Sequence, residues 1–483
     1  MRGTTWLLIP KYLFILLHIS FISLTAISQQ KTVVFSELGS ERYKNKIVQL
    51  EKYTVPKTYQ IKDAQAWYEE ILTDRNKSLL SMFKENKLVY DTLLLNKCNS
   101  ILQRIIAANS AFRFDTIQLY INRSIVANAA CYGEGTVIIN AGLFLWIDND
   151  DELALVLAHE FAHQLLDHSS DKIGKSIKIV TSDDFKTALK DIKKADYGKY
   201  DRFRKLMKDL NIESGRHSTY KEGEADSLGA VLIKNAGFNV PTAAAILLKL
   251  DKVDELFTSD GLYSLKDFFG KTTADITFLD AKPKYNGLSS ANVTMNADKD
   301  IDSIKTHPDC IKRYESITGK THIPVSCCTT ISNSYEAFKQ RALLEMVRYL
   351  YENNSISMCA HLCFFALKNN YDPVIYNYFI SLCFSNLFYS DKHLERFKVA
   401  NAYASKGSNL KQVQDFFFNL SSTDIEILSA QFLNYKEDNS SEDFEFTRMI
   451  YNIQVKMKDP DAALSNFNNR FPKNKYQYLN QPK

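Results

Sequence analysis

The sequence lacks the features that mark a disulfide-stapled, membrane-embedded or nucleic-acid-binding protein. Its eight cysteines are spread over 483 residues and include no C-x-x-C pair, so they indicate neither a disulfide scaffold nor a zinc ribbon. Beyond residue 28, no segment approaches the roughly 18 uninterrupted apolar residues of a membrane span, which predicts a soluble mature protein. The 60 basic and 56 acidic residues nearly balance, so the charge gives no reason to expect nucleic acid as a partner.

The first 28 residues have the pattern of a secretory signal peptide. Arg2 and Lys11 form a basic start, residues 12–27 are an uncharged apolar run, and small residues precede a predicted cleavage site before Gln29. This pattern predicts export to the periplasm or cell envelope. An uncleaved membrane anchor is the alternative, although the apolar run is shorter than the ~20 residues that a span prefers.

The rest of the chain has ordinary globular composition, with 45% hydrophobic and 24% charged residues, and its length suits two or three domains. Residues 29–62 are polar without a clear period, so we expect a linker or arm. Residues 63–330 combine helical periodicity with two strand-like segments, which predicts an α+β, mostly helical domain with a small sheet. The expected strands are 115–122 and 136–140, the second after a turn at 133–135, and helices are expected within 64–107 and at 185–194, 203–210, 222–235 and 242–256.

Residues 331–483 show helical spacing throughout, which predicts an all-α domain. The expected helices cover residues 338–351, 356–367, 374–388, 394–404, 413–418, 446–457 and 462–471. Helices of this length with short polar links are typical of stacked helical hairpins, so we expect a tetratricopeptide-like (TPR-like) domain. A generic helical domain is the alternative, because no strict repeat of about 34 residues occurs. Cys359 and Cys363, four residues apart in an apolar run, are expected to be buried.

One stretch, residues 151–168, carries the chemistry. His159, Glu160 and His163 form the pattern H-E-x-x-H. On a helix, the two histidines share a face and point two imidazoles at one cation, while Glu160 lies alongside. Apolar residues run nearly all round this predicted helix, so we expect it to be buried and to hold metal ligands rigidly.

A catalytic zinc usually takes three protein ligands plus water, so the third ligand must come from elsewhere in the chain. Glu222 and Asp226 lie four residues apart on a predicted helix, roughly 60 residues downstream. One carboxylate can bind the metal while the other accepts the free ring N–H of a ligating histidine. The two motifs together predict one Zn²⁺ per chain.

These motifs resemble those of the gluzincin peptidases of the CAAX prenyl protease and HtpX superfamily, and among them the soluble periplasmic BepA-like proteases with a tetratricopeptide domain. The matching segments are DELALVLAHEFAH at 151–163, His168 five residues later, EGEADSLGA at 222–230 and THPDCIKR at 306–313. Asn128-Ala129 matches the family's start of the substrate-side strand. Gly133-Glu134-Gly135 departs from the family's usual Pro-Gly-Gly and puts the local turn in question.

The resemblance implies a zincin-like metallopeptidase domain and assigns roles residue by residue. His159, His163 and Glu222 would bind Zn²⁺, and Asp226 would orient one of the histidines. Glu160 would be the catalytic carboxylate that moves protons between water and the leaving amine.

Catalysis also needs a group that stabilises the developing oxyanion from across the cleft. His307 and Arg313 are the candidates, because they belong to a motif that the family places near the metal. A surface ion pair is the alternative for Arg313. His168 is either a hydrogen-bond partner of a zinc ligand or a hydrogen-bonded histidine at a helix end, and we expect the latter.

The expected function is that of an exported zinc-dependent endopeptidase acting on misfolded or assembling cell-envelope proteins. An unfolded substrate would join an edge strand at 136–140 as an extra antiparallel strand. The C-terminal helices would recruit protein partners such as envelope assembly machinery, and peripheral membrane association stays open. Two alternatives are a non-catalytic, zinc-stabilised interaction or chaperone module, which has no need of Glu160, and a membrane-anchored processing protease.

Overall fold

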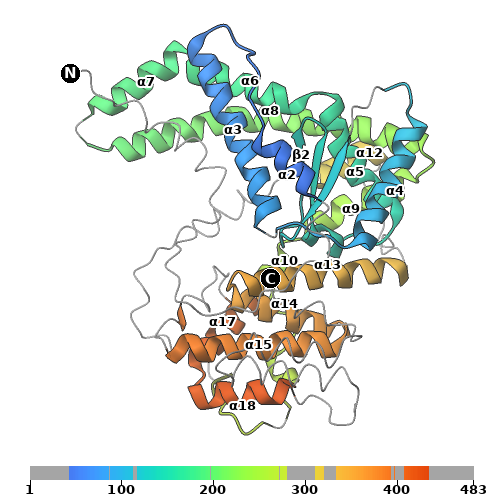
Figure 1. The fold of residues 1–483 in the computed structure, drawn as a ribbon, viewed down its shortest axis with the longest axis vertical. Coiled ribbons are helices and arrows are strands. Elements are labelled where there is room, and N and C mark those ends of the chain that lie inside the picture. Colours follow the sequence, from blue (N-terminus) through green and yellow to red (C-terminus); the bar gives the residue numbers. More distant parts are fainter. Residues whose placement is uncertain are drawn as a thin grey trace.

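Apolar periodicity folds most of this chain into helices, which enclose one small sheet (Figure 1). The computed structural model describes residues 43–433 apart from residues 86, 113–116, 196, 271, 280–309, 320–332, 393–395 and 398–406. The predicted signal peptide and the last two expected helices therefore lie outside the described residues, as does most of the helix expected at 394–404.

The α+β, mostly helical fold class is confirmed. In chain order, the described elements are α2 (Lys44–Glu51), α3 (Lys62–Lys84), α4 (Thr92–Ala108), β1 (Gln118–Asn122), β2 (Ala129–Gly133), β3 (Thr136–Asn140), η2 (Ala141–Leu145), α5 (Asp150–Leu165), α6 (His168–Thr181), α7 (Asp183–Lys194), α8 (Lys199–Asn235), α9 (Val240–Leu250), α10 (Glu255–Thr258), η3 (Leu265–Phe268), η4 (Thr277–Leu279), α12 (Cys310–Thr318), α13 (Asn333–Glu352), α14 (Ile356–Lys368), α15 (Pro373–Lys392), α17 (Asn409–Asn419) and α18 (Ser422–Leu433). The segment 29–62, expected to be a linker or arm, differs from this expectation in part. It contains helix α2, which buries Leu50 in an apolar cluster with Phe83 of α3.

The sheet has three strands in the order β1-β3-β2, with β1 parallel and β2 antiparallel to β3. The segment 136–140 is therefore the central strand, and the expectation that it forms the edge is wrong. Its sequence TVIIN is a run of consecutive apolar residues, which is typical of a strand covered on both faces but fits an edge and a central position alike. The edge strand beside it is β2, which begins at the Asn128-Ala129 pair that the resemblance indicated. Periodicity did not show it, because its sequence AACYG has small residues and lacks the alternation that marks a strand.

A tight turn at 133–135 joins β2 to β3, as predicted. Its three residues all have left-handed backbone angles, with φ of 81° at Gly133, 49° at Glu134 and 73° at Gly135. Glycine adopts such angles without strain, so Gly-Glu-Gly still gives a sharp reversal. The pairing of β2 with β3 shifts between Cys131 and Gly133, which is typical of a β-bulge.

Helix α5 packs against β2 on one side and against α4, α8 and α9 on others. Its residues from Glu152 to Ala162 are all buried, which confirms the burial predicted from its apolar character. Asn149 caps the helix by accepting a hydrogen bond from the Glu152 N–H at 3.0 Å. Asp150 and Asp151 add negative charge at the positive end of the helix dipole. The turns that carry the histidines are thus fixed by packing on several sides.

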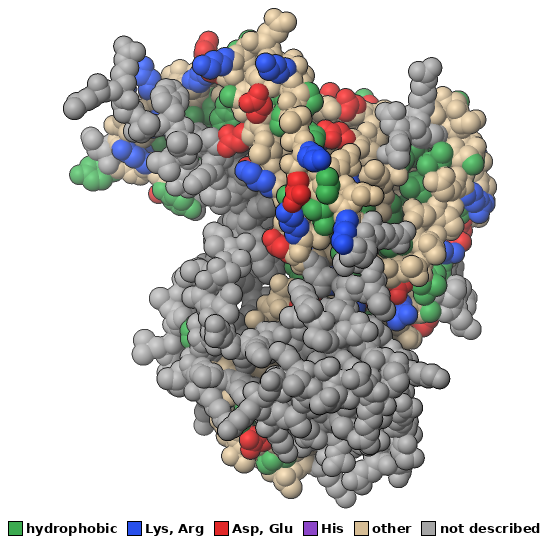
Figure 2. Space-filling view, viewed as in Figure 1, with side chains coloured by type: hydrophobic (Ala, Val, Ile, Leu, Met, Phe, Trp, Pro, Cys, Tyr) green, Lys and Arg blue, Asp and Glu red, His purple; other side chains and the backbone are tan. Residues whose placement is uncertain are grey.

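Helix α7 and the adjoining parts of α6 and α8 project from the body (Figure 1), while α6 packs against α3 and α8 packs against α5. The 37 residues of α8 span about 55 Å. The polar helices expected at 185–194 and 203–210 are confirmed as parts of α7 and α8. Figure 2 shows acidic and basic side chains interspersed over the upper part of the face in view. No helix among the described residues combines the length and the apolar character that crossing a bilayer requires.

The C-terminal helices share a continuous apolar core with the sheet and α5. Helix α13 packs against η2 and α4, and α14 contacts both α13 and α15. Buried ion pairs tie α13 to the segments around the sheet, among them Arg123 with Glu345 at 2.9 Å and Lys339 with Asp148. The TPR-like character of this part and the boundary near residue 330 stay predictions.

Candidate metal centre

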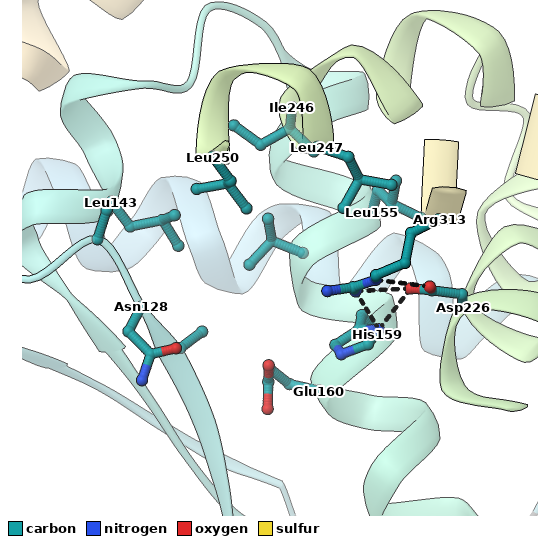
Figure 3. Close-up of a pocket in the computed structure, with 13 residues that line it drawn as sticks. Asn128, Leu143, Leu155, His159, Glu160, Asp226, Ile246, Leu247, Leu250 and Arg313 are labelled. Atoms are coloured by element: carbon teal, nitrogen blue, oxygen red, sulfur yellow. Dashed lines mark hydrogen bonds and ion pairs between the residues drawn. The ribbon is translucent and has the colours of Figure 1, made fainter. Parts of the chain in front are cut away.

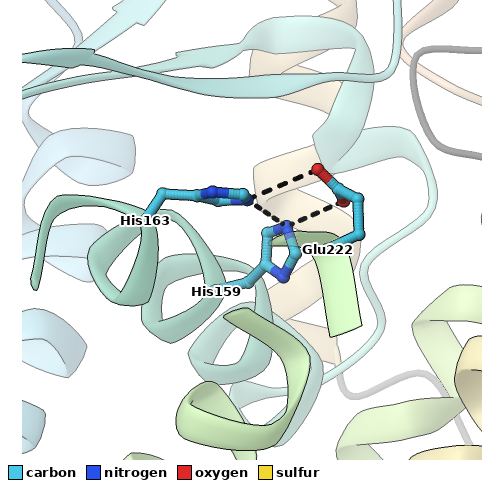
Figure 4. A group of neighbouring side chains, drawn as sticks. All are labelled: His159, His163 and Glu222. Atoms are coloured by element: carbon cyan, nitrogen blue, oxygen red, sulfur yellow. Dashed lines mark hydrogen bonds and ion pairs between the residues drawn. The ribbon is translucent and has the colours of Figure 1, made fainter. Parts of the chain in front are cut away.

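Three side chains from two helices converge on one point (Figure 4). Helix α5 supplies His159 and His163, whose Nε2 atoms are 3.1 Å apart, and α8 supplies Glu222. Glu222 Oε2 lies 3.4 Å from His159 Nε2, and Glu222 Oε1 lies 3.5 Å from His163 Nε2. Ligand atoms bonded to a tetrahedral zinc at about 2.0–2.1 Å are about 3.3–3.4 Å apart. The nature and the spacing of these donors therefore fit a zinc ion.

The approach of α8 to α5 depends on Gly229. A Cβ atom at this position would lie 3.2 Å from the backbone nitrogen of His159 and 3.4 Å from the carbonyl carbon of Ala158. Glycine lets the two helices come this close, which brings Glu222, two turns earlier on α8, against both histidines.

Asp226 fixes the orientation of His159. Its Oδ1 atom is 2.9 Å from His159 Nδ1, so the ring donates from Nδ1 and turns Nε2 toward Glu222. Burial by itself lowers the pKa of His159, but hydrogen bonds to Asp226 and Glu222 outweigh burial and raise this pKa to about 9. Because a metal binds only the unprotonated ring nitrogen, metal binding at neutral pH has to displace a proton.

Arg313 of α12 belongs to the same network (Figure 3). Its Nε and Nη2 atoms each donate to Asp226 at 2.7 Å, a bidentate arrangement, and its Nη1 atom lies 3.5 Å from Glu222 Oε2. Burial raises the pKa of Asp226, but the hydrogen bonds from Arg313 and His159 dominate and lower it to about 2. The Arg313 side chain is only 11% exposed, so its ion pairs are buried rather than at the surface. His307 lies outside the described residues.

His168 supports the second histidine. The chain reverses at Asp167, where φ is 51°, and the first residue of α6 comes to lie beside α5. His168 Nδ1 is then 2.8 Å from His163 Nδ1. If His163 presents Nε2 to the metal, its Nδ1–H donates and His168 Nδ1 accepts. Burial and the nearby Lys221 lower the pKa of His168, which favours the neutral ring that this bond requires.

Glu160 lines a pocket next to the histidines (Figure 3). Its side chain lies between His159 and the start of β2, where Asn128 and Ala129 form the opposite wall. The rest of the wall is mostly apolar and is formed by Ala127, Leu143, Leu155, Val156, Ile246, Leu247 and Leu250. A buried carboxylate, one of the three potential metal ligands and the start of an edge strand thus line one cavity.

The structure brings together every predicted site residue that it describes. The two roles considered for His168 do not exclude one another, because His168 begins α6 and its Nδ1 also lies 2.8 Å from His163 Nδ1. The only cue in the sequence was its position five residues after His163. The third ligand and its neighbour, Glu222 and Asp226, were found because their helical spacing was visible in the sequence.

A His-His-Glu cluster beside a buried glutamate is the donor set of a metallopeptidase. Residues 95–321 match peptidase family M48, so the chain contains a domain of this family. A 76-residue segment is 36% identical to the beta-barrel assembly-enhancing protease of Yersinia pestis. That match covers 16% of this chain and 15% of the relative's length. The resemblance inferred from the motifs is confirmed for this domain.

Proposed function

We propose that this chain is an exported zinc-dependent endopeptidase that cleaves misfolded or assembling cell-envelope proteins. The observation that carries the proposal is the position of Glu160, which lines a pocket between the zinc-compatible cluster and an edge strand. A purely structural zinc site needs no such carboxylate. The arrangement therefore supports hydrolysis over a non-catalytic role.

The residues of the site would act on the water molecule, the scissile carbonyl and the leaving amine. A zinc ion held by His159, His163 and Glu222 would polarise the scissile carbonyl and acidify a water molecule. Glu160 accepts the proton of that water and passes it to the leaving amine. Arg313, held by Asp226, directs Nη1 toward the same space, where it can stabilise the developing oxyanion.

The proposed substrate strand is β2 rather than β3. An edge strand has unpaired backbone groups that can bind an extended peptide, and β2 is the edge nearer Glu160 because Asn128 and Ala129 line its pocket. A substrate antiparallel to β2 would place its scissile bond beside Glu160. The apolar wall with Leu143 and Ile246 would then receive an apolar side chain next to that bond.

The decisive test compares zinc-loaded wild type with Glu160→Gln on denatured casein. The wild type should cleave, and the variant should lose at least about a hundredfold in rate, because general-base catalysis contributes about 10²–10⁴-fold. Equal zinc content in both proteins controls for loss of the metal. Equal cleavage that a chelator does not reduce would reject the proposal and favour the non-catalytic interaction or chaperone module.

Export and recruitment are separate parts of the proposal. The basic and apolar pattern of residues 1–28 supports export, and amino-terminal sequencing of the fractionated protein distinguishes a cleaved signal from an anchor. The printed name of the Yersinia pestis relative links that protein to beta-barrel assembly, which supports an envelope assembly partner for the C-terminal helices. Capture of bound proteins with Glu160→Gln would identify such partners.

A further inference from the structure

The backbone groups of β2 face alternately toward β3 and away from it. The Asn140 N–H donates to the Asn128 carbonyl at 2.8 Å, so Asn128 faces β3. Backbone groups of an antiparallel strand alternate between its two sides, which directs Ala129 and Cys131 away from β3. These two residues would therefore pair with an added strand.

Two side chains from other helices occupy the far end of this edge. Ser169 of α6 lies with its Oγ 3.4 Å from the carbonyl oxygen of Cys131. Arg75 of α3 donates from Nη1 to the carbonyl oxygen of Tyr132 at 3.2 Å, at the β-bulge that interrupts the alternation between Cys131 and Gly133. Among the residues that the structure describes, no side chain forms a corresponding hydrogen bond to the backbone of Ala129. Within the described residues, the edge is therefore uncapped at Ala129, which lines the pocket and is 8% exposed, and capped about two residues further along.

Arg75 is held in this position by contacts of its own. Its Nη2 atom lies 2.8 Å from Glu134 and 3.3 Å from the hydroxyl of Tyr53, which itself donates to Glu134 at 3.1 Å. The absence of a side chain at Gly133 leaves room for the guanidinium, since a Cβ there would lie 3.2 Å from Nη1. The Arg75 side chain is 17% exposed. A peptide cannot pair with the edge past Cys131 while this group is in place.

The end of β2 that Arg75 and Ser169 cap lies close to Glu160. Cys131 donates from Sγ to Gln164 at 3.2 Å, and Gln164 is one turn after Glu160 on α5. A substrate strand antiparallel to β2 runs from the Gly133 end toward the Asn128 end. Residues that precede its scissile bond would therefore meet the capped end, and residues that follow the bond would lie toward Asn128.

We propose, on the basis of the peptidase function above, that Arg75 and Ser169 set how the substrate's amino-terminal flank binds. Strand pairing extends over about two substrate residues on that side, after which the flank leaves the sheet edge. The substrate residues that determine selectivity are then those next to the scissile bond and those on its carboxyl side. Arg75 is a specificity-determining residue, and its removal opens further backbone groups of β2 to the substrate.

The first test measures binding without turnover. The probe is reduced and carboxymethylated α-lactalbumin, which stays unfolded, and the background is Glu160→Gln. Adding Arg75→Ala should tighten binding about fivefold, as expected for one or two further backbone hydrogen bonds. Lys77→Ala is the matched control, because Lys77 is an exposed cation on the same helix that pairs with Asp74. It should leave the affinity unchanged.

Ser169→Ala provides a second variant, because it removes only a hydroxyl group and should not disturb folding. It should tighten binding about twofold. Thermal unfolding and zinc content verify the fold of each variant. If Arg75 serves only to hold α3 against the sheet, Arg75→Ala and Ser169→Ala will leave the affinity for the unfolded probe equal or lower. That result would overturn the inference.

The second test measures kcat/KM for two peptides built around the casein bond that the wild type cuts fastest. They carry two or six residues before that bond. The longer peptide should show no gain with wild type and a gain of about fivefold with Arg75→Ala. A gain in both proteins would overturn the inference. Failure of wild type to cleave casein would reject the proposed function alone, because the binding test needs no turnover.

Discussion

Glu345 of α13 lies between two arginines in the interior, and its removal should cost far more than the loss of an exposed ion pair. Arg123 is fully buried, with its Nε 2.9 Å from Glu345 Oε2, and Arg348 Nη1 lies 3.2 Å from Oε1. Removing one partner from a buried pair costs about 3–5 kcal/mol, because the remaining charge stays desolvated. We therefore expect Glu345→Ala to lower the free energy of unfolding by about that amount.

Urea unfolding of the zinc-loaded protein measures the effect. Lys368→Ala is the matched control, because Lys368 pairs with Asp267 at 3.7 Å but both side chains are about half exposed. This control should lose less than about 1 kcal/mol. Replacing both members of one buried pair, Arg123→Met with Glu345→Leu, should recover only part of the loss, because Arg348 still loses its ion pair with Glu345. An effect of Glu345→Ala no larger than that of the control would refute the reasoning.

Two further predictions concern histidines outside the ligand set. His168→Ala should lower zinc affinity about 10- to 100-fold, because His163 loses the acceptor that orients its ring; competition with a chromophoric chelator measures this, and unchanged affinity would remove His168 from the site. His361 should make the fold acid-sensitive, because burial lowers its pKa to about 4 while an unfolded histidine titrates near 6.5. Its contribution is fully present above about pH 6.5 and falls by up to about 3 kcal/mol as the pH drops toward 4. Urea unfolding at about pH 7 and about pH 4.5 should show a smaller acid loss for His361→Gln, and an equal loss would contradict the assignment.

Local periodicity was enough to find the elements that carry the candidate metal ligands. His159 and His163 are four residues apart, as are Glu222 and Asp226, and a helix turns each spacing into a shared face. The burial of α5 also followed from its sequence, because apolar residues surround the helix. Strand order could not be inferred in the same way, because TVIIN reads as a strand whether it lies at the edge or at the centre.

The sequence by itself determined the donor set, the adjacent Glu160 and the mostly helical character of the chain, because these depend on residue types and on spacings within one helix. Only the tertiary structure decided which groups meet across elements. It showed that Arg313 bonds to Asp226, that His168 bonds to His163, and that Arg75 bonds to the end of β2. Each of these contacts joins segments that are far apart in the chain or that meet across a chain reversal. Such contacts depend on how helices pack against one another and against the sheet, and apolar periodicity shows which face of a helix is buried but not which partner it meets.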